Sequence, residues 1–403
     1  MRVFLNSLAA ASLVAGLAFA AMPPTAGLAA GPTPTIVVNV FDPVAHPVPY
    51  DASDADLGDG VCDTDITDGG TVTCSLRAAI ENANLNSDLD VIGFALTAPN
   101  DGSHYLYVPA TALPDITESV FIDGYSQSGS GSGPIIVLNG SGAGGGAHGF
   151  VVASGGVTIQ GFVIQAFGGD GIRITSASGS NEIYGNYIGT DKSGGSGSVA
   201  NDIGIRVSSS PANTIGGSGN ISGYSVPKRN IISGNTTTGV LITGSGSISN
   251  AVVGNYIGTQ INGTVSLSNG GSGIEVTNAP NTVIGGSNAG EGNVISANGG
   301  YGLEITGASS SGTQVQGNSI GLDKNSQGAL GNASDGIYVN DVSGLTIGGT
   351  TSGARNGIGS NGGSGIYLDT TADDVTIQGN YIGLAADGLN ARANSSDGDR
   401  KSV

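Results

Sequence analysis

The chain of 403 residues contains no Trp, two Cys and only 12 Lys and Arg. So few cations argue against a nucleic-acid or anionic-lipid partner, because both require clusters of Lys and Arg. Hydrophobic residues make up 38% of the chain, which is little for one large globular core and suits a thin, elongated one. Beyond the N-terminus no segment approaches the roughly 20 apolar residues that cross a bilayer, so we expect no membrane insertion in this chain.

Glycine and acidic residues are abundant instead. The chain has 73 Gly, and with only 14 Pro it fits neither collagen nor a Pro-rich linker. Asp and Glu outnumber Lys and Arg by 31 to 12, which gives a formal net charge of −19. Such acidity keeps a protein soluble, and binding of Ca²⁺ by a subset of the acids is the alternative use of the charge.

The N-terminus has the pattern of a secretory signal peptide, which we place at residues 1–30. Arg2 supplies the positive charge, residues 8–19 are apolar, and Ala18–Ala20 forms a small-residue cleavage site, with residues 28–30 as a second candidate. The apolar stretch is too short to span a bilayer. We therefore expect a secreted or cell-surface protein, with a retained anchor as the alternative.

Four near-copies of one hexapeptide divide the second half of the chain. They begin at Gly185, Gly254, Gly317 and Gly379, and three of them read Gly-Asn-Tyr-Ile-Gly followed by Thr or Leu. Their offsets are 69, 63 and 62 residues (254 − 185, 317 − 254 and 379 − 317). Self-similarity at a fixed period indicates a repeat architecture and is a stronger guide to the fold than any local pattern.

Each interval holds two turns of three short β-type segments. The simplest turn comprises residues 157–161, 162–165 and 171–174, in which apolar and polar residues alternate as in half-buried strands. One turn cannot bury its apolar face alone, but stacked turns place Ile on Ile along three sheets. The sequence therefore predicts an all-β fold over residues 91–397, a right-handed parallel β-helix of three strands per coil and about ten coils. A β-propeller is the main alternative.

Asn residues recur at matched corners of these coils, where stacked side chains form hydrogen-bonded ladders. The matched sets are Asn235, Asn298 and Asn361, and Asn186, Asn255, Asn318 and Asn380. Longer insertions rich in Gly, Ser and Asn occupy alternate coils, at residues 191–200, 260–269 and 323–332. They fall between the second and third strands, so we expect them along one edge of the column, as binding loops or as solvated spacers.

Residues 31–90 are expected to precede the coils as an acidic loop, a disulfide and a capping helix. Four apolar residues of the segment 76–83 share one helical face, and such a helix covers the open end of a β-helix. Cys62 and Cys74 are an even pair in an exported chain, which favours one disulfide over free thiols.

The acidic loop offers the best candidate for a metal site. Asp54, Asp56 and Asp59 alternate with small residues, so their carboxylates supply the oxygen ligands that Ca²⁺ prefers. The closing bidentate Glu of a calcium loop is absent, so a solvated acidic loop stays the alternative.

The residues around the two cysteines resemble a known family. Residues 59–62, Asp-Gly-Val-Cys, are followed at 74–80 by Cys-Ser-Leu-Arg-Ala-Ala-Ile, which resembles the motif of the CSLREA-domain proteins. The resemblance covers roughly residues 50–390 and implies export and right-handed parallel β-helix repeats of the pectin-lyase-like fold. It implies no established reaction. Ala78 stands where the motif has Glu, so any role of that Glu is absent here.

The third segment of successive coils carries the candidate contact residues. Glu275 and Glu304 take the same outward position in two coils, and Tyr338 and Tyr367 take it in the next two. Stacked exposed Tyr side chains bind sugar rings, whereas a ladder of aromatic side chains across the coils is the structural alternative. We therefore name these four residues as candidate carbohydrate contacts.

Other charged residues give a weaker signal for catalysis. The nearest pairings are Asp170 with Arg173 and Asp202 with Arg206, and such pairs more often form surface salt bridges. The remaining acids are scattered and only three His occur, so no catalytic residue is assigned.

The sequence thus favours a non-catalytic scaffold with a structural, adhesive or carbohydrate-contacting role, with an extracellular polysaccharide or a host or cell surface as partner. A polysaccharide lyase or glycoside hydrolase is the alternative, which requires two acids and a base within about 10 Å. Residues 398–403 break the repeat pattern, and we expect them to be a truncation artefact.

Overall fold

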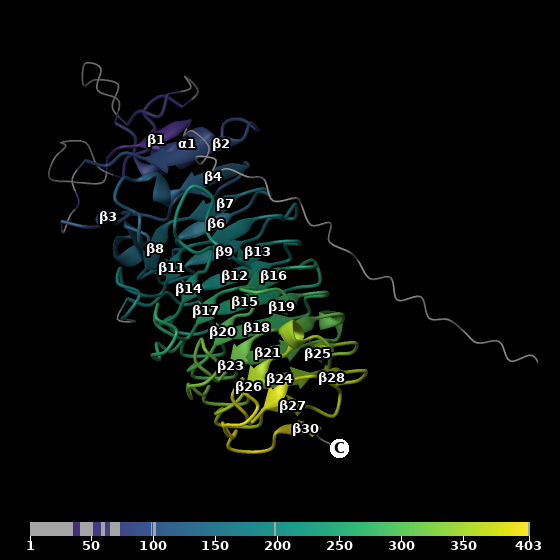
Figure 1. Ribbon diagram of the computed structural model, residues 1–403. Helices are drawn as coiled ribbons and strands as arrows, with labels where there is room; N and C mark the ends of the chain where they lie inside the picture. Colours follow the sequence, from purple (N-terminus) through teal and green to yellow (C-terminus); the bar gives the residue numbers. More distant parts are fainter. Residues whose placement is uncertain are drawn as a thin grey trace, which may run out of the picture.

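The computed structural model describes residues 35–40, 51–57, 61–64, 73–97, 99, 102–196 and 199–401. The chain forms a column of stacked coils, a right-handed parallel β-helix (Figure 1). From β4 to β30 the strands visit three sheets, A, B and C, in that order, nine times over. The predicted all-β fold of three strands per coil is confirmed, whereas the predicted signal peptide lies outside the described residues.

Sheet A has eleven strands, and every neighbouring pair is parallel. Its strands are β1 (Ile36–Val38), β2 (Asp90–Phe94), β4 (Val120–Asp123), β7 (Thr158–Gln160), β10 (Glu182–Tyr184), β13 (Thr214–Gly216), β16 (Ala251–Val253), β19 (Val283–Gly285), β22 (Gln314–Gln316), β25 (Thr346–Gly348) and β28 (Thr376–Gln378). Strand β1 was not anticipated, since a lone Ile-Val-Val triplet lies far from the repeats in sequence. It pairs with β2 and therefore extends sheet A into the segment before residue 91.

Sheets B and C repeat the same parallel arrangement with ten and nine strands. Sheet B comprises β3 (Tyr105–Tyr107), β5 (Ile136–Asn139), β8 (Phe162–Gln165), β11 (Tyr187–Ile188), β14 (Ile231–Ile232), β17 (Tyr256–Ile257), β20 (Val294–Ile295), β23 (Ser319–Ile320), β26 (Gly357–Ile358) and β29 (Tyr381–Ile382). Sheet C comprises β6 (Phe150–Val152), β9 (Ile172–Ile174), β12 (Ile205–Ser208), β15 (Val240–Thr243), β18 (Ile274–Thr277), β21 (Leu303–Thr306), β24 (Ile337–Asn340), β27 (Ile366–Leu368) and β30 (Asp399–Lys401). Short 3₁₀ turns occur at Gly124–Ser126, Gly140–Gly142, Ala308–Ser310 and Ser352–Ala354.

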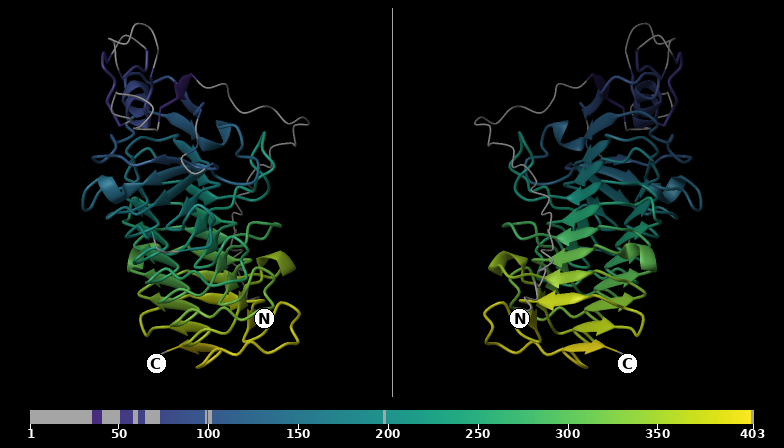
Figure 2. Two further views of the ribbon diagram at one scale, coloured as in Figure 1. Left: turned by 90° about the vertical axis from the view of Figure 1, so that its left-hand side faces the viewer. Right: turned by 90° about the vertical axis from the view of Figure 1, so that its right-hand side faces the viewer.

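The core is a filled column of aliphatic side chains between the three sheets. In the coil of β16, β17 and β18, Val252, Ile257, Ile274 and Val276 point inward and are all 0% exposed. Each stacks on its register partner in the coils before and after, as Ile257 does on Ile232 and Ile295. Burying one such side chain contributes about 1.5–3 kcal/mol to the free energy of folding. Because every coil repeats this burial, the contributions add up along the column. Figure 2 shows the strands of neighbouring coils stacked along the column axis.

Two Asn ladders hold the corners, as the repeats predict. In both ladders the Asn Nδ2 donates to Oδ1 of the Asn one coil further on, at 2.9–3.3 Å, and the backbone N–H donates to the same oxygen. The corner between sheets A and B carries Asn186, Asn230, Asn255, Asn293, Asn318, Asn356 and Asn380. The corner between sheets B and C carries Asn201, Asn235, Asn269, Asn298, Asn332, Asn361 and Asn394. Every Asn of the two ladders except Asn380 is buried, so these bonds satisfy groups that water cannot reach.

The insertions in alternate coils gather on one side, and they lie over the outer face of sheet B. The loops at 191–200, 260–269 and 323–332 bond to one another across two coils, where Ile261 N–H donates to Gly194 O and Lys324 N–H donates to Gly263 O, both near 2.9–3.0 Å. A fourth loop joins the series through Ala386 N–H and Ser326 O at 2.9 Å. The expectation of a shared edge is thus confirmed.

The N-terminal end of the column carries α1 (Leu76–Ala83). Ser75 caps it, because its Oγ accepts the Ala78 N–H at 3.0 Å. The helix packs its buried face against the core at β1 and β2, as expected of a cap. Cys62 and Cys74 form the predicted disulfide, which ties the preceding segment to the start of the helix.

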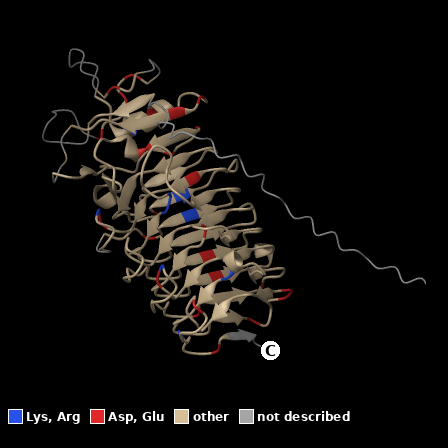
Figure 3. Ribbon diagram, in the orientation of Figure 1, with Lys and Arg blue, Asp and Glu red and all other residues tan. Residues whose placement is uncertain are grey.

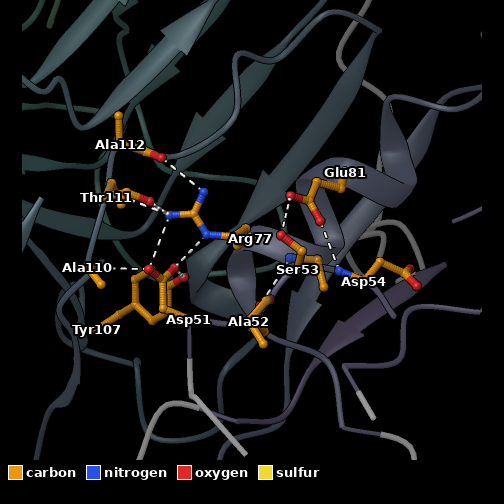
Figure 4. A network of polar contacts seen from close by, with 12 residues as sticks. Asp51, Ala52, Ser53, Asp54, Arg77, Glu81, Tyr107, Ala110, Thr111 and Ala112 are labelled. Atoms are coloured by element: carbon orange, nitrogen blue, oxygen red, sulfur yellow. Dashed lines mark hydrogen bonds and ion pairs between the residues drawn. The ribbon is translucent and has the colours of Figure 1, made fainter. Parts of the chain in front are cut away.

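One buried ion pair fastens this cap (Figure 4). Asp51 accepts hydrogen bonds from Arg77 Nε at 2.9 Å and Nη2 at 3.1 Å, and also from the Tyr107 hydroxyl. Burial, and then the charge of Asp51, raises the pKa of Tyr107 well above its ordinary value, so the phenol stays a donor. The other Arg77 donors reach Thr111 and the carbonyl of Ala112, so residue 77 joins helix, loop and column.

At the opposite end, Asp399–Lys401 forms β30 and pairs with β27. The backbone of this segment thus continues sheet C by one strand. The origin of residues 398–403 stays a prediction.

Candidate functional site

The outer face of sheet C carries one uninterrupted row of side chains from different coils. In the strands of this sheet from β6 to β27 the first and third residues point into the core, so the second points outward. The parallel register brings these second residues together as partners from strand to strand. We call them the central row, which runs Val151, Arg173, Arg206, Leu241, Glu275, Glu304, Tyr338 and Tyr367.

Two arginines of this row share one carboxylate. Arg173 Nε and Arg206 Nε donate to the same Oδ2 of Asp170, at 3.0 and 2.9 Å. The Asp170 side chain is 1% exposed, whereas those of Arg173 and Arg206 are 35% and 23% exposed. Within the described part of the chain neither guanidinium has a further hydrogen bond, so two partly exposed cations share one buried carboxylate and the three groups carry a net positive charge.

His148 completes this cluster but is poorly suited to act as a base. Its Nδ1 accepts the Asp170 backbone N–H at 2.8 Å, so in the neutral ring the proton is on Nε2. Burial lowers the pKa of His148, and the charge of Arg173 lowers it further. The 3.5 Å approach of Nδ1 to Asp170 Oδ2 is therefore a contact of two acceptors. His148 therefore lacks the free acceptor nitrogen that a general base needs.

The two glutamates follow one strand spacing apart. Glu275 and Glu304 are register partners on β18 and β21, and both are half-buried. Ser272 Oγ donates to Glu304 at 2.9 Å, and Thr277 Oγ1 donates to Glu275 at 3.3 Å. Burial raises the pKa of Glu304, and the adjacent charge of Glu275 adds to the rise, although the Ser272 hydrogen bond opposes it.

The row ends in an aromatic stack. The rings of Tyr338 and Tyr367 stack with centroids 5.7 Å apart, and Tyr301 stacks on the other side of Tyr338 at 4.8 Å. Beside the central row, the fourth residues of the strands add a hydroxyl-rich row of Ser208, Thr243, Thr277, Thr306 and Asn340. The face therefore combines cations, carboxylates, hydroxyls and aromatic side chains. Figure 3 shows which strands of this face carry charged residues.

A shallow hollow adjoins the cationic end of the row. Its volume is about 430 Å³, and its lining includes Phe167, Asp202 and Thr236. Asp202 does not pair with Arg206 as the sequence suggested, because its Oδ1 accepts from Thr237 Oγ1 at 3.2 Å and Arg206 turns to Asp170. Arg206 therefore pairs with Asp170 of the preceding coil rather than with Asp202 of its own coil.

The structure therefore brings Glu275, Glu304, Tyr338 and Tyr367 into one row, as their matched positions predicted. Sequence reasoning missed His148 and Tyr301, which come from corners rather than from the repeated strand segment. Each lies two residues before the first residue of a strand of sheet C, and this constant spacing is the signal that could have located them.

The predicted calcium loop is partly outside the described residues, because Asp59 lies there. Asp54 is buried, and its carboxylate accepts from Asp56 N–H at 3.1 Å and from Asn82 Nδ2 at 3.3 Å. These hydrogen bonds hold the acidic loop against α1. Among the described residues no group of three or more His, Cys, Asp or Glu is arranged to hold a metal ion. Calcium at this loop stays a prediction.

No family model matches the chain, and no curated protein matches its sequence. Membership of the CSLREA-domain proteins therefore stays a prediction. No helix in the described part of the chain is long and apolar enough to cross a membrane.

Solved structures give distant fold matches. The A-module of the mannuronan C-5 epimerase AlgE4 of Azotobacter vinelandii aligns with a TM-score of 0.39 and 16% identity over 83% of this chain and 77% of that one. The periplasmic alginate epimerase AlgG aligns with a TM-score of 0.41 and 15% identity over 74% and 72%. The Dettilon tailspike protein aligns with a TM-score of 0.32 and 16% identity over 87% and 67%. Likeness at this level says nothing about activity.

Proposed function

We propose that this protein is an exported β-helix scaffold that contacts a polysaccharide through the outer face of sheet C, without catalysis. The observation that carries the proposal is the central row, in which a shared arginine pair, a glutamate pair and a tyrosine stack follow one another in a line. Sugars are bound by aromatic side chains and by charged or hydroxyl partners for their polar groups, and this row presents all of these.

The dimensions of the row suit an extended chain. From Arg173 to Tyr367 the row crosses six strand spacings of about 4.8 Å, or about 29 Å in all. A pyranose unit is similar in length to one strand spacing, so successive sugars meet successive coils. A polysaccharide lying along the column would meet the edges and hydroxyl groups of the stacked Tyr338 and Tyr367 and place an acidic group at the arginines.

Export and the division into residues 31–90 as a cap and residues 91–397 as a column belong to the same proposal. The disulfide between Cys62 and Cys74 supports an oxidising compartment. The apolar N-terminal sequence of residues 1–30 supports secretion.

Binding to immobilised polysaccharides tests the proposal. The double variant Tyr338→Ala, Tyr367→Ala removes the aromatic stack from partly exposed positions, so we expect retardation by the matrix to be lost while the thermal midpoint changes little. Tyr381→Ala on the outer face of sheet B is the matched control and should bind like the wild type. Equal binding by all three proteins on every acidic and neutral matrix would refute the role of sheet C.

The glutamate pair supports a second candidate, a glycoside hydrolase. Retaining hydrolases use two carboxyl groups about 5–5.5 Å apart, one of them with a raised pKa, and partners on neighbouring strands lie near that spacing. Glu304 would be the acid and Glu275 the nucleophile. Neither glutamate lines the hollow at the cationic end of the row, which favours binding over hydrolysis.

An activity screen separates the two candidates. Purified protein incubated with acidic and neutral polysaccharides, with and without Ca²⁺, should release neither reducing ends nor unsaturated products. Reducing ends that disappear in Glu304→Gln would establish the hydrolase, and unsaturated products would establish a lyase.

A further inference from the structure

The hexapeptide repeat places a tyrosine beneath each loop that covers sheet B, except in one coil. Tyr187, Tyr256 and Tyr381 occupy equivalent outward positions on β11, β17 and β29. Each ring lies under a glycine of the loop that follows, and the pairs are Tyr187 with Gly194, Tyr256 with Gly263 and Tyr381 with Gly388.

These three glycines are required by the rings below them. Their φ angles are +66°, +65° and +69°, and a Cβ added to Gly263 would lie 2.6 Å from the Tyr256 ring. A side chain at this loop position is thus strained by the backbone conformation and crowded by a ring below it.

The third repeat departs from this rule at both positions together. Ser319 replaces the tyrosine on β23, and Ser326 replaces the loop glycine while keeping a positive φ of 52°. The two hydroxyls hydrogen-bond to each other. The tyrosine and its covering glycine are thus replaced together, as a pair, in this one coil.

The missing ring leaves a pocket, which we call the third-repeat pocket. Its volume is about 500 Å³, within the range of about 300–1,000 Å³ that holds small ligands. Ser319 and Ser326 line it together with Tyr256, Arg229 and Lys324, and residues 286–292 form a glycine-rich wall.

Two cationic side chains, Arg229 and Lys324, line this pocket, although the chain has a net charge of −19. The Arg229 guanidinium lies 3.8 Å from the centre of the Tyr256 ring, and its Nε is buried without a hydrogen-bond partner in the described part of the chain. The nearby carboxylate of Glu291 accepts from the backbone N–H and Nδ2 of Asn288 at 3.0 and 2.9 Å. Asp323 accepts backbone N–H groups of its own loop. Neither carboxylate forms an ion pair with Arg229 in the described part of the chain, so the guanidinium keeps its positive charge at a site lined by hydroxyls.

We propose that the third-repeat pocket binds one anionic sugar unit, with its carboxylate or sulfate on Arg229 and Lys324 and its hydroxyl groups on Ser319 and Ser326. The site lies over sheet B and is independent of the contact face on sheet C. A uronate and a sulfated sugar share the required chemistry, since both combine a pyranose ring with a fixed negative charge.

Restoring the repeat rule tests the proposal. Ser319→Tyr with Ser326→Gly rebuilds the pairing of the other three coils, so the variant should fold at least as stably while filling the pocket. Ligand-observed NMR with glucuronate, glucose 6-sulfate, inorganic sulfate and glucose should show binding of one or both charged sugars to the wild type, and a loss of about tenfold or more in affinity in the variant.

Further variants keep the test decisive if that double variant does not fold. Arg229→Gln should weaken binding of the charged sugars. Arg355→Gln, which removes a comparable cation from above Tyr381 outside the pocket, should not. Binding of inorganic sulfate alone would show an adventitious anion site and overturn the proposal. So would equal affinity for glucose, unchanged affinity in Arg229→Gln, or no binding by the wild type.

Discussion

The N-terminal cap and the column are stabilised in opposite ways. The column repeats one small set of contacts in every coil, so Ile stacks on Ile and Asn bonds to Asn along its length. The cap depends on contacts that occur once, namely the disulfide and the ion pair between Asp51 and Arg77. Loss of one contact in the column is therefore expected to be compensated by the same contacts in neighbouring coils. Loss of a contact in the cap is not compensated, because no other residues repeat it.

Removal of Arg77 should give the largest effect. Arg77→Ala leaves Asp51 buried without its cation, and breaking a buried pair in this way costs about 3–5 kcal/mol. Hydrogen exchange should show the loss in α1 and β1 before it appears in β17. The control is Arg355→Ala at the column surface, for which we expect a change of about 1 kcal/mol or less. A uniform loss of protection along the whole chain would contradict the distinction between cap and column.

Loss of the disulfide should follow in size. Cys62→Ser with Cys74→Ser releases a short loop, and the chain-entropy model assigns about 3 kcal/mol to such a closure. Limited proteolysis should then cut the segment before α1 while residues 102–196 stay intact. Cleavage within the coils at the same rate would show that the cap and the column unfold together.

A single break in an Asn ladder should cost less. Asn255→Ala removes the Oδ1 that accepts from both the backbone N–H and Nδ2 of Asn230, so the backbone N–H loses its acceptor, and an unsatisfied buried group costs about 1–3 kcal/mol. Denaturant unfolding measures this loss. Asn262→Ala, in an exposed loop, is the matched control. If the two variants were equally stable, the ladders would not contribute to the column.

The smallest effect concerns the outer face of sheet C. Because burial and then Glu275 raise the pKa of Glu304 in the folded protein, the fold favours its protonated form, and stability falls as pH rises through that pKa. Glu304→Gln should therefore raise the thermal midpoint slightly at neutral pH and leave it unchanged in acid. Glu275→Gln should lower the pKa of Glu304 toward its ordinary value, measured by NMR titration of the carboxyl group.

The contrast between the two regions also explains what could be predicted from the sequence. Matched positions such as Glu275 and Tyr338 could be assigned to one outer row because the strand register follows the repeat. The contact between Asp51 and Arg77 spans 26 residues without any periodic pattern, so only the structure reveals it. Asp170 illustrates both cases, since its bond to Arg173 follows from spacing and its bond to Arg206 depends on the corner between coils.

The covering loops have a consequence for how this molecule can change in length. They occur in every second coil and bond to each other across the coil between. Removing a coil without a loop would set two loops on directly neighbouring coils, and removing a coil with a loop would leave two bare coils side by side, whereas removing two consecutive coils would restore the alternation. Natural variation in the number of coils should therefore proceed by pairs, and the unit that duplicates is a double coil of 62–69 residues.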